Sequence, residues 1–416
     1  MKKSIIAVIC IILVLSLSAC TGNPVAESPS GSDKDSQMVN IETQPTLPPV
    51  ADKTVADAPP TSTETAPYME KRGKIENAVF SVKTQAEAAE VLIDAIEVFA
   101  DKITFDLSRT NVKSSEWKML VQNAYFDIFT ENPRLKYAYD IKLEQAGSKV
   151  ICTISYMPYK LGNMDESSLS DETYKIYSLK DLIKAANESI GKSSVPIAIL
   201  NRNLDVDDMQ NALMQAGYSY IVFTLNNDAT QIKAYPTNQR TMEECVDYIS
   251  KTKALAKDIY SKIITNKMTN DEKLEAIYRY ITSTVKYDQR YYDAPDTIPY
   301  ESTTAYGAYE NKTAICGDCS WSVNMLAELA GIECYNVTGP TYSGESHMWN
   351  IIKYKGNFYY FDATWDLGAD GDYRYFAKTA DEFSSDRQWD NADFINKLIK
   401  NQLNDFAYAA LFEKVK

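Results

Sequence analysis

The fold of the C-terminal half is decided by residues 346–366, which read SHMWNIIKYKGNFYYFDATWD. Within this stretch two apolar and aromatic runs, 349–354 and 357–363, flank the pair Lys355-Gly356. Runs of this composition around two turn-forming residues are typical of a β-hairpin with a tight turn. We therefore predict two neighbouring antiparallel strands in this part of the chain.

The length of the turn decides whether His347 can meet Asp362. A two-residue turn pairs Trp349 with Asp362, so His347, which precedes Trp349 by two positions, shares a strand face with Asp362. The pair are then diagonal neighbours, roughly 7–8 Å apart at the backbone, a gap that two side chains close. A three-residue turn would place them on opposite faces. We expect the shorter turn and a contact between His347 and Asp362.

Upstream of the hairpin, Cys316 precedes a segment with helical spacing, residues 318–330, which Gly331 is expected to end in a left-handed conformation. At the start of a helix the unpaired amides and the dipole favour a thiolate, and the same amides can hold an oxyanion. His347 is the single histidine of the chain, so any imidazole chemistry must use it. The order Cys316, His347, Asp362 predicts a triad in which Asp362 orients the imidazole and His347 takes the thiol proton.

Four motifs over roughly residues 250–385 resemble the core of the transglutaminase-like superfamily. They are Ala305-Tyr306-Gly307-Ala308, the fifteen-residue spacing from Cys316 to Gly331-Ile332, His347-Met348-Trp349-Asn350, and the stretch 358–366 with its ending Asp-Ala-Thr-Trp-Asp. The resemblance implies an α+β fold with a papain-like core, in which a Cys-bearing helix packs on an antiparallel sheet. It also implies acyl transfer through a thioester, with no cofactor and no metal.

Carried over by position, the resemblance assigns a role to each of the matching residues. Cys316 is implied to be the nucleophile, His347 the base and Asp362 the orienting acid. Three further residues are implied to pack around them: Trp349, Asn350 and Trp365.

The start of the Cys-bearing segment departs from many superfamily members, which have Cys-x-Gly-Tyr where this chain has Cys316-Gly317-Asp318-Cys319. Asp318 beside the thiol disfavours a thiolate unless its side chain points away. Cys319 is an alternative nucleophile, although its spacing to Gly331 is twelve residues and not fifteen. Cys316-x-x-Cys319 also fits a redox pair or half of a zinc site, but no second such pair is present and the single histidine would have to be the third ligand.

The N-terminus has the features of a targeting segment. Lys2 and Lys3 precede a short apolar run, and residues 1–19 are predicted to be a signal peptide. Leu17-Ser18-Ala19-Cys20 resembles a bacterial lipobox, which implies cleavage before Cys20 and lipidation of its sulfur; an ordinary secretory signal is the alternative. Residues 20–66 lack aromatic residues and are predicted to be a disordered tether. The folded protein is then expected on the extracytoplasmic face of a bacterial membrane, held by a lipid anchor.

The folded part is predicted to begin with an α+β N-terminal domain, residues 67–240. The order strand, helix, strand, strand is found first over residues 103–156 and again over residues 196–235. Either a duplication or a coincidence explains this repeat. This region shows no catalytic pattern, so we expect a binding or spacer role. A transglutaminase-like domain over residues 241–385 and a peripheral helical extension over residues 386–416 are predicted to follow.

The net charge of −14 and the lack of a basic stripe argue against a nucleic-acid partner. We predict an extracytoplasmic, cysteine-dependent enzyme that acts on amide bonds of a protein or peptide substrate, for which the location suggests the cell envelope. Release of the thioester by water makes it a peptidase or amidase, and release by an amine makes it a protein transglutaminase. The alternative is a catalytically silent transglutaminase-like binding module on the cell surface.

Overall fold

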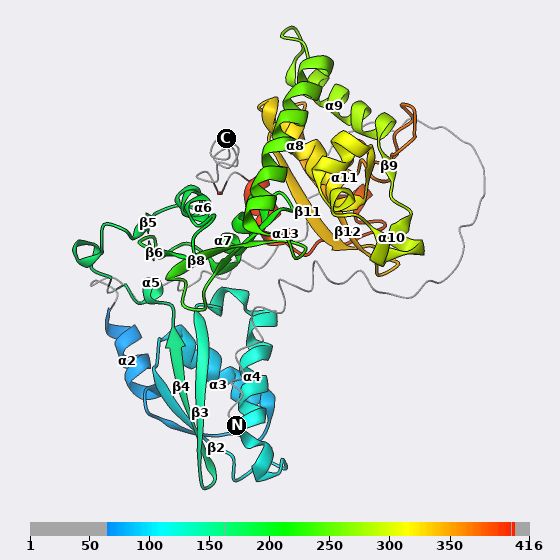
Figure 1. Ribbon diagram of the computed structural model, residues 1–416. Helices are drawn as coiled ribbons and strands as arrows, with labels where there is room; N and C mark the ends of the chain where they lie inside the picture. The colour runs from blue at the N-terminus through cyan, green and yellow to red at the C-terminus, as the bar shows by residue number, and fades with distance from the viewer. Residues whose placement is uncertain (1–64, 163, 401, 404–416) are drawn as a thin grey trace.

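The computed structural model describes residues 65–162, 164–400 and 402–403. The expected signal peptide, Cys20 and almost all of the expected tether lie outside the described residues. Helix α2 (Thr65–Ile75) begins just inside the segment expected to be tether. The α+β class is confirmed, because helices and mostly antiparallel sheets alternate along the chain (Figure 1). Within the described ranges, no helix combines the length and the apolar character that a membrane crossing requires.

Two units of the same topology make up the N-terminal half. Their sheets have the orders β1-β2-β4-β3 and β5-β6-β8-β7, with the first pair parallel and the other pairs antiparallel. The first unit consists of β1 (Val79–Ser81), α3 (Gln85–Glu97), β2 (Lys102–Asp106), α4 (Trp117–Glu131), β3 (Ala138–Ala146) and β4 (Lys149–Tyr156). After α5 (Pro158–Leu161), the second consists of β5 (Tyr174–Ile176), α6 (Leu179–Glu188), β6 (Val195–Ile199), α7 (Val206–Ala216), β7 (Ile221–Leu225) and β8 (Gln231–Pro236).

Each unit has one more strand and one more helix than the sequence pattern indicated. The strands β1 and β5 span three residues each, too short for an alternating pattern to be recognised. Gly217 ends α7, but its φ of −89° is not left-handed. A Cβ there would lie 1.7 Å from the carbonyl oxygen of Ile221, so a glycine is needed because β7 approaches closely.

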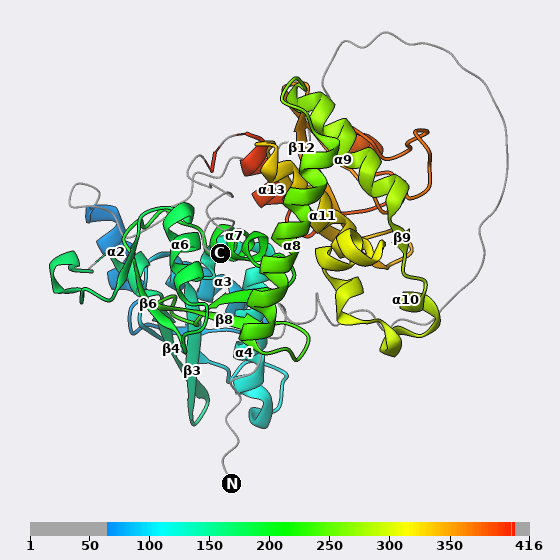
Figure 2. The same cartoon turned by 45° about the horizontal axis from the view of Figure 1, so that its top comes forward.

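The C-terminal domain places one buried helix between other helices and a three-stranded sheet. Helix α11 (Cys316–Leu329) packs on the sheet β11-β12-β13 and also contacts α8 (Met242–Ile263) and α9 (Asn270–Thr284) (Figures 1 and 2). The strands are β11 (Cys334–Pro340), β12 (Ser346–Tyr354) and β13 (Asn357–Phe361). The smaller elements are β9 (Lys286–Tyr287), α10 (Arg290–Asp293), β10 (Thr313–Ala314), α12 (Ala380–Phe383) and α13 (Ala392–Ile399).

The local signals near the site were mostly interpreted correctly. The hairpin has the expected two-residue turn, in which Lys355 and Gly356 both have positive φ (49° and 83°) and Tyr354 pairs with Asn357. Gly331, with φ of 70°, follows α11 as expected. Thr269 and Glu272 form a reciprocal capping box that fixes the start of α9.

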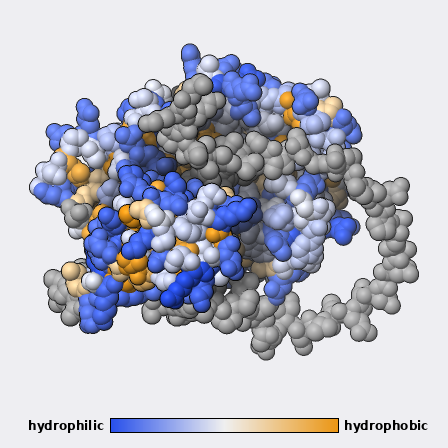
Figure 3. Space-filling view, turned by 90° about the horizontal axis from the view of Figure 1, so that it is seen from below, coloured by the Kyte–Doolittle hydropathy of each residue, from blue (hydrophilic) through white to orange (hydrophobic). Residues whose placement is uncertain are grey.

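The second unit docks on the C-terminal domain, whereas the first extends away from it (Figure 1). Helix α13 packs on α7, and Lys397 forms an ion pair with Asp208 at 2.7 Å. Residues 386–400 are therefore packed into the molecule, and the expectation of a peripheral extension was wrong for them. The face seen in Figure 3 is mainly hydrophilic, with hydrophobic residues in small separate patches.

Candidate active site

Cys316 is the first residue of α11, and its side chain is half-buried. The neighbouring thiol, Cys319, lies one turn further on and is completely buried. Burial, followed by the charge of Asp318, raises the pKa of Cys319 well above its ordinary range, so this thiol stays protonated. A buried, protonated thiol is a poor nucleophile. Of the two cysteines, Cys316 alone has the position and exposure that nucleophilic chemistry needs.

Asp318 is only 2% exposed, and burial followed by the charge of Cys316 raises its pKa well above the ordinary range of a carboxyl. Burial thus disfavours the ionised form of this carboxyl. The side chain that raised doubt in the sequence is thus held where its negative charge is disfavoured.

His347 connects the thiol to a carboxylate. Its Nε2 lies 2.7 Å from Oδ2 of Asp362, and the side chain of Cys316 is near enough to the ring to affect its pKa. Burial by itself would lower the pKa of His347, but the charge and hydrogen bond of Asp362, together with Cys316, outweigh it and raise the pKa to about 10. The imidazole therefore carries its proton at neutral pH, in the state that pairs with a thiolate.

Asp362 is fully buried and every side of its carboxylate is occupied. Oδ1 accepts hydrogen bonds from the backbone amides of Thr364 (3.0 Å) and Trp365 (3.2 Å), and Oδ2 lies 2.7 Å from both His347 and Arg387. Burial would raise the pKa of Asp362, but the two cationic partners and their hydrogen bonds hold it below the ordinary value. The group is a fixed, charged acceptor.

Arg387 is the member of this cluster that the sequence did not reveal. Its side chain is completely buried, and Nη1 donates to Oδ2 of Asp362 at 2.7 Å. It follows Asp362 by 25 positions. No motif or periodic pattern surrounds this arginine, so no signal in a single sequence could have identified it.

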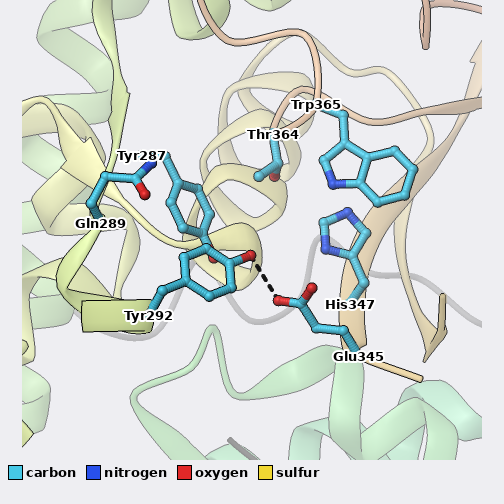
Figure 4. Close-up of a pocket in the computed structure, with 7 residues that line it drawn as sticks. All are labelled: Tyr287, Gln289, Tyr292, Glu345, His347, Thr364 and Trp365. Carbon is cyan, nitrogen blue, oxygen red and sulfur yellow. Dashed lines mark hydrogen bonds between the residues drawn. The ribbon is translucent and has the colours of Figure 1, made fainter. Parts of the chain in front are cut away.

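The three packing residues implied by the resemblance differ in what they contact. The indole of Trp365 stacks on the ring of His347, with centroids 4.9 Å apart and an interplanar angle of 22° (Figure 4). Trp349 is buried and lies 6.0 Å from the same ring. Asn350 instead donates to the carbonyl of Ser320 (3.1 Å) and to Oδ1 of Asn336 (2.7 Å), which ties β12 to α11 and β11.

A pocket with a volume of about 200 Å³ opens beside His347. It is lined by Tyr287, Gln289, Tyr292, Glu345, His347, Thr364 and Trp365 (Figure 4). Across it, the hydroxyl of Tyr292 donates to Oε1 of Glu345 at 2.8 Å. No motif in the sequence indicated that the rings of Tyr287 and Tyr292 would line a pocket at the histidine.

In the described ranges, no group of three or more His, Cys, Asp and Glu side chains is placed to hold a metal ion. Cys316 and Cys319 are both free thiols in the structure.

Comparison with known proteins agrees with the sequence motifs. Residues 255–363 match the family model described as the transglutaminase-like superfamily, so this part of the chain is a transglutaminase-like domain. Among curated proteins, none matches the chain.

Two solved structures show weak similarity. One is described as a TGase (13% identity, 51% of this chain and 64% of that chain covered, TM-score 0.26). The other, from Cytophaga hutchinsonii, is described as a proposed cysteine protease (13% identity, 56% and 64% covered, TM-score 0.24). The chain thus aligns with 64% of the length of each, and the family assignment rests on the sequence match alone.

Proposed function

We propose that this protein is a cysteine-dependent enzyme that transfers acyl groups from amide bonds through a thioester, with Cys316 as nucleophile, His347 as acid and base, and Asp362 as orienting carboxylate. The observation that carries the proposal is the placement of His347 at the edge of a pocket, with Asp362 bonded to its ring and Cys316 beside it. A thiol at a helix N-terminus, next to a protonated imidazole, is the arrangement that activates sulfur.

The reaction follows from these positions. The thiolate of Cys316 attacks the carbonyl carbon, a C–S bond forms, and the oxyanion is stabilised by amides of the first turn of α11. The C–N bond then breaks, and the departing amine takes a proton from the imidazolium of His347. Water or a second amine attacks the thioester, gives its proton to the now neutral His347, and releases Cys316. The products are an acid or a new amide.

A trapping experiment on the full-length chain tests the proposal. The protein is mixed with a peptide library, with and without a labelled amine, and the intact mass of the protein is measured. We expect an acyl adduct on Cys316 that is absent in Cys316→Ala and present in Cys319→Ala. A chain that forms no adduct, and whose Cys316 reacts with iodoacetamide no faster than a free thiol near pH 7, is a silent binding module and not an enzyme.

The pocket favours an amine over water as the second reactant. Its lining places the carboxylate of Glu345 among the rings of Tyr287, Tyr292 and Trp365. Aromatic faces and a carboxylate attract an alkylammonium group, which loses one proton to solvent before its lone pair attacks the thioester. The neutral His347 in the same pocket then takes the second proton. We therefore propose protein transglutaminase activity ahead of simple hydrolysis.

Two labelled nucleophiles separate these outcomes. A primary alkylamine is cationic near pH 7, whereas methoxyamine is uncharged. We expect Glu345→Gln to raise the KM for the alkylamine about 3- to 10-fold while methoxyamine is used as before, because the substitution removes a charge from the pocket. The matched control is Glu333→Gln, which removes an exposed carboxylate bonded to Lys353. Equal effects on both nucleophiles would remove the basis for an amine preference.

The location of the enzyme is a separate part of the proposal. We propose that Cys20 carries a lipid that holds the folded body on the outer face of a bacterial membrane, where envelope proteins and peptides are within reach. In bacterial cells, the wild-type chain should partition into a detergent phase and Cys20→Ser should remain in the aqueous phase. Aqueous partition of both chains, with cleavage at a different residue, would indicate an ordinary secretory signal.

A further inference from the structure

Arg387 is held by two carboxylates and several aromatic rings. Its side chain is completely buried, Nη1 donates to Asp362, and Nε donates to Oδ1 of Asp386 at 2.7 Å. The centre of the guanidinium lies over four aromatic rings: Trp365 at 4.0 Å, Phe383 at 4.5 Å, Trp349 at 5.0 Å and Tyr375 at 5.2 Å. Ring faces attract a cation, and the Asp362 carboxylate offsets the cost of removing its charge from water.

A short segment, residues 386–390, brings Arg387 to this place, and we call it the C-terminal strap. It lies along the outer edge of β11, where Gln388 N donates to Pro340 O and Asp390 N donates to Thr338 O, both at 2.9 Å. At Gly339 an added Cβ would lie 1.9 Å from the carbonyl oxygen of Gln388, so the strap packs where only glycine leaves room. Before Arg387, Tyr342 N donates to Asp386 O at 2.9 Å, so the position of Arg387 is fixed by backbone contacts on both sides of it.

The two cations share one oxygen. Oδ2 of Asp362 lies 2.7 Å from Nε2 of His347 and 2.7 Å from Nη1 of Arg387. The remaining oxygen is bound by two backbone amides, so the carboxylate cannot rotate without losing several hydrogen bonds at once. The imidazole that faces Cys316 is therefore aligned through a carboxylate whose own orientation depends on Arg387.

We infer that Arg387 is a positioning residue for the proposed acyl transfer, which acts through Asp362 to hold His347 in line with Cys316. The inference rests on the proposed function. It also implies that the reactive site extends beyond the transglutaminase-like match at residues 255–363, because the strap supplies one of its members from further along the chain.

The test compares variants of Arg387 with a neighbour in the strap. Arg387→Met keeps much of the volume but removes the charge and the hydrogen bonds, whereas Arg387→Lys keeps the charge. The control is Trp389→Phe. Trp389 lies in the same strap as Arg387 and packs on Trp349 and Tyr360 of the sheet. For each full-length chain, two rates are measured between pH 5 and pH 10. One is alkylation of Cys316 by iodoacetamide, and the other is turnover of a peptide substrate identified in the trapping experiment. The folded fraction is determined by thermal unfolding.

For Arg387→Met we expect kcat and the alkylation rate to fall about 10- to 100-fold per folded molecule, with KM nearly unchanged, because a charged hydrogen bond to the orienting carboxylate is lost. In plots of the two rates against pH, the decline on the acid side (the acid limb) should move to higher pH, because Asp362 loses a cation that keeps it ionised. Arg387→Lys should keep the acid limb and recover part of the rate. The profile reports the whole cluster of ionisable groups around Asp362: His347, Arg387, Asp386, Cys319, Tyr278 and Asp366.

The inference is overturned if Arg387→Met and Trp389→Phe lower the melting temperature similarly while both keep the wild-type rate and acid limb per folded molecule. Arg387 would then serve stability alone. A wild-type chain without an activated Cys316 thiol would instead contradict the proposed function. The two failures are thus distinguished by the wild-type measurement.

Discussion

Two buried polar networks meet on β12, and they are made of different groups. One contains charges and joins Cys316, His347, Asp362 and Arg387. The other is uncharged and runs from α7 to α11: Gln215 exchanges two hydrogen bonds with the backbone of Asn336 (2.7 and 3.0 Å), and Asn350 connects Asn336 to Ser320 O. His347 and Asn350, three residues apart on β12, belong to different networks.

The difference indicates what each network is for. Paired amides are buried at modest cost because hydrogen bonds replace those to water, so such a network can join two domains and fix their geometry. Charges are expensive to bury, and a structure that needed only stability would do as well with apolar side chains. Concentrating a thiol, an imidazolium, a carboxylate and a guanidinium beside a pocket therefore points to chemistry, whereas the amide network points to assembly.

The largest expected effect comes from breaking the charged network at its centre. His347→Ala should lower the rate of acyl transfer by about 10³- to 10⁴-fold, because neither the thiol nor the leaving amine has another proton partner. Cys316→Ala and Asp362→Ala should also abolish most activity. The measurement is single-turnover transfer from a trapped peptide, with the folded fraction checked by circular dichroism. Full activity of His347→Ala would reject the mechanism, since the chain has no other histidine.

The charged network should also set a limit at high pH. The pKa of His347 is raised to about 10, so the imidazolium is present below that pH and is lost above it. Alkylation of Cys316 as a thiolate can continue above pH 10, but kcat should fall about tenfold per pH unit there, because the leaving amine no longer receives a proton. The stability of the folded protein should also fall as pH rises through this range. A raised folded-state pKa contributes stability that is complete below the unfolded value near 6.5 and is lost as pH rises through about 10.

A pH series that includes His347→Ala checks both parts. The wild-type free energy of unfolding should decline toward pH 10 relative to that of the variant. A kcat that stays level from pH 8 to pH 11 would contradict a proton donor with this pKa.

The two networks also differ in how far the sequence revealed them. His347 and Asp362 could be paired because the turn at Lys355-Gly356 fixes the register, and register is a local property. Arg387 and Gln215 could not be found, because their contacts join segments that only the folded chain brings together. The doubt about Asp318 had the same origin, since its protonation depends on burial in α11 and not on its neighbours in sequence.

Breaking the amide network should have a smaller effect, and on stability only. Gln215→Ala leaves the backbone N–H and C=O of Asn336 unpaired in a buried place, which should cost about 2–4 kcal/mol of the free energy of unfolding. The acyl-transfer rate per folded molecule should stay at the wild-type value. Asn211→Ala is the matched control, because it removes a hydrogen bond within the same helix. A selective loss of activity in Gln215→Ala would show that the domain contact also shapes the charged network.

The smallest effect tests whether the part of the domain contact around α11 is kept free of charge. Glu328, on α11, accepts a hydrogen bond from Tyr218 OH at 3.0 Å, and burial, opposed by Tyr218 and Lys253, raises its pKa to about 8. A carboxyl with a raised folded-state pKa loses stability as pH rises from its unfolded value near 4.5 through about 8. Glu328→Gln is already neutral, so between pH 6 and pH 8.5 it should lose roughly 2–3 kcal/mol less than the wild type in urea unfolding. If the free energies of unfolding of the two chains change with pH in parallel, Glu328 is ionised at this contact. Only the amide network of Gln215, Asn336 and Asn350 would then contrast with the charged site.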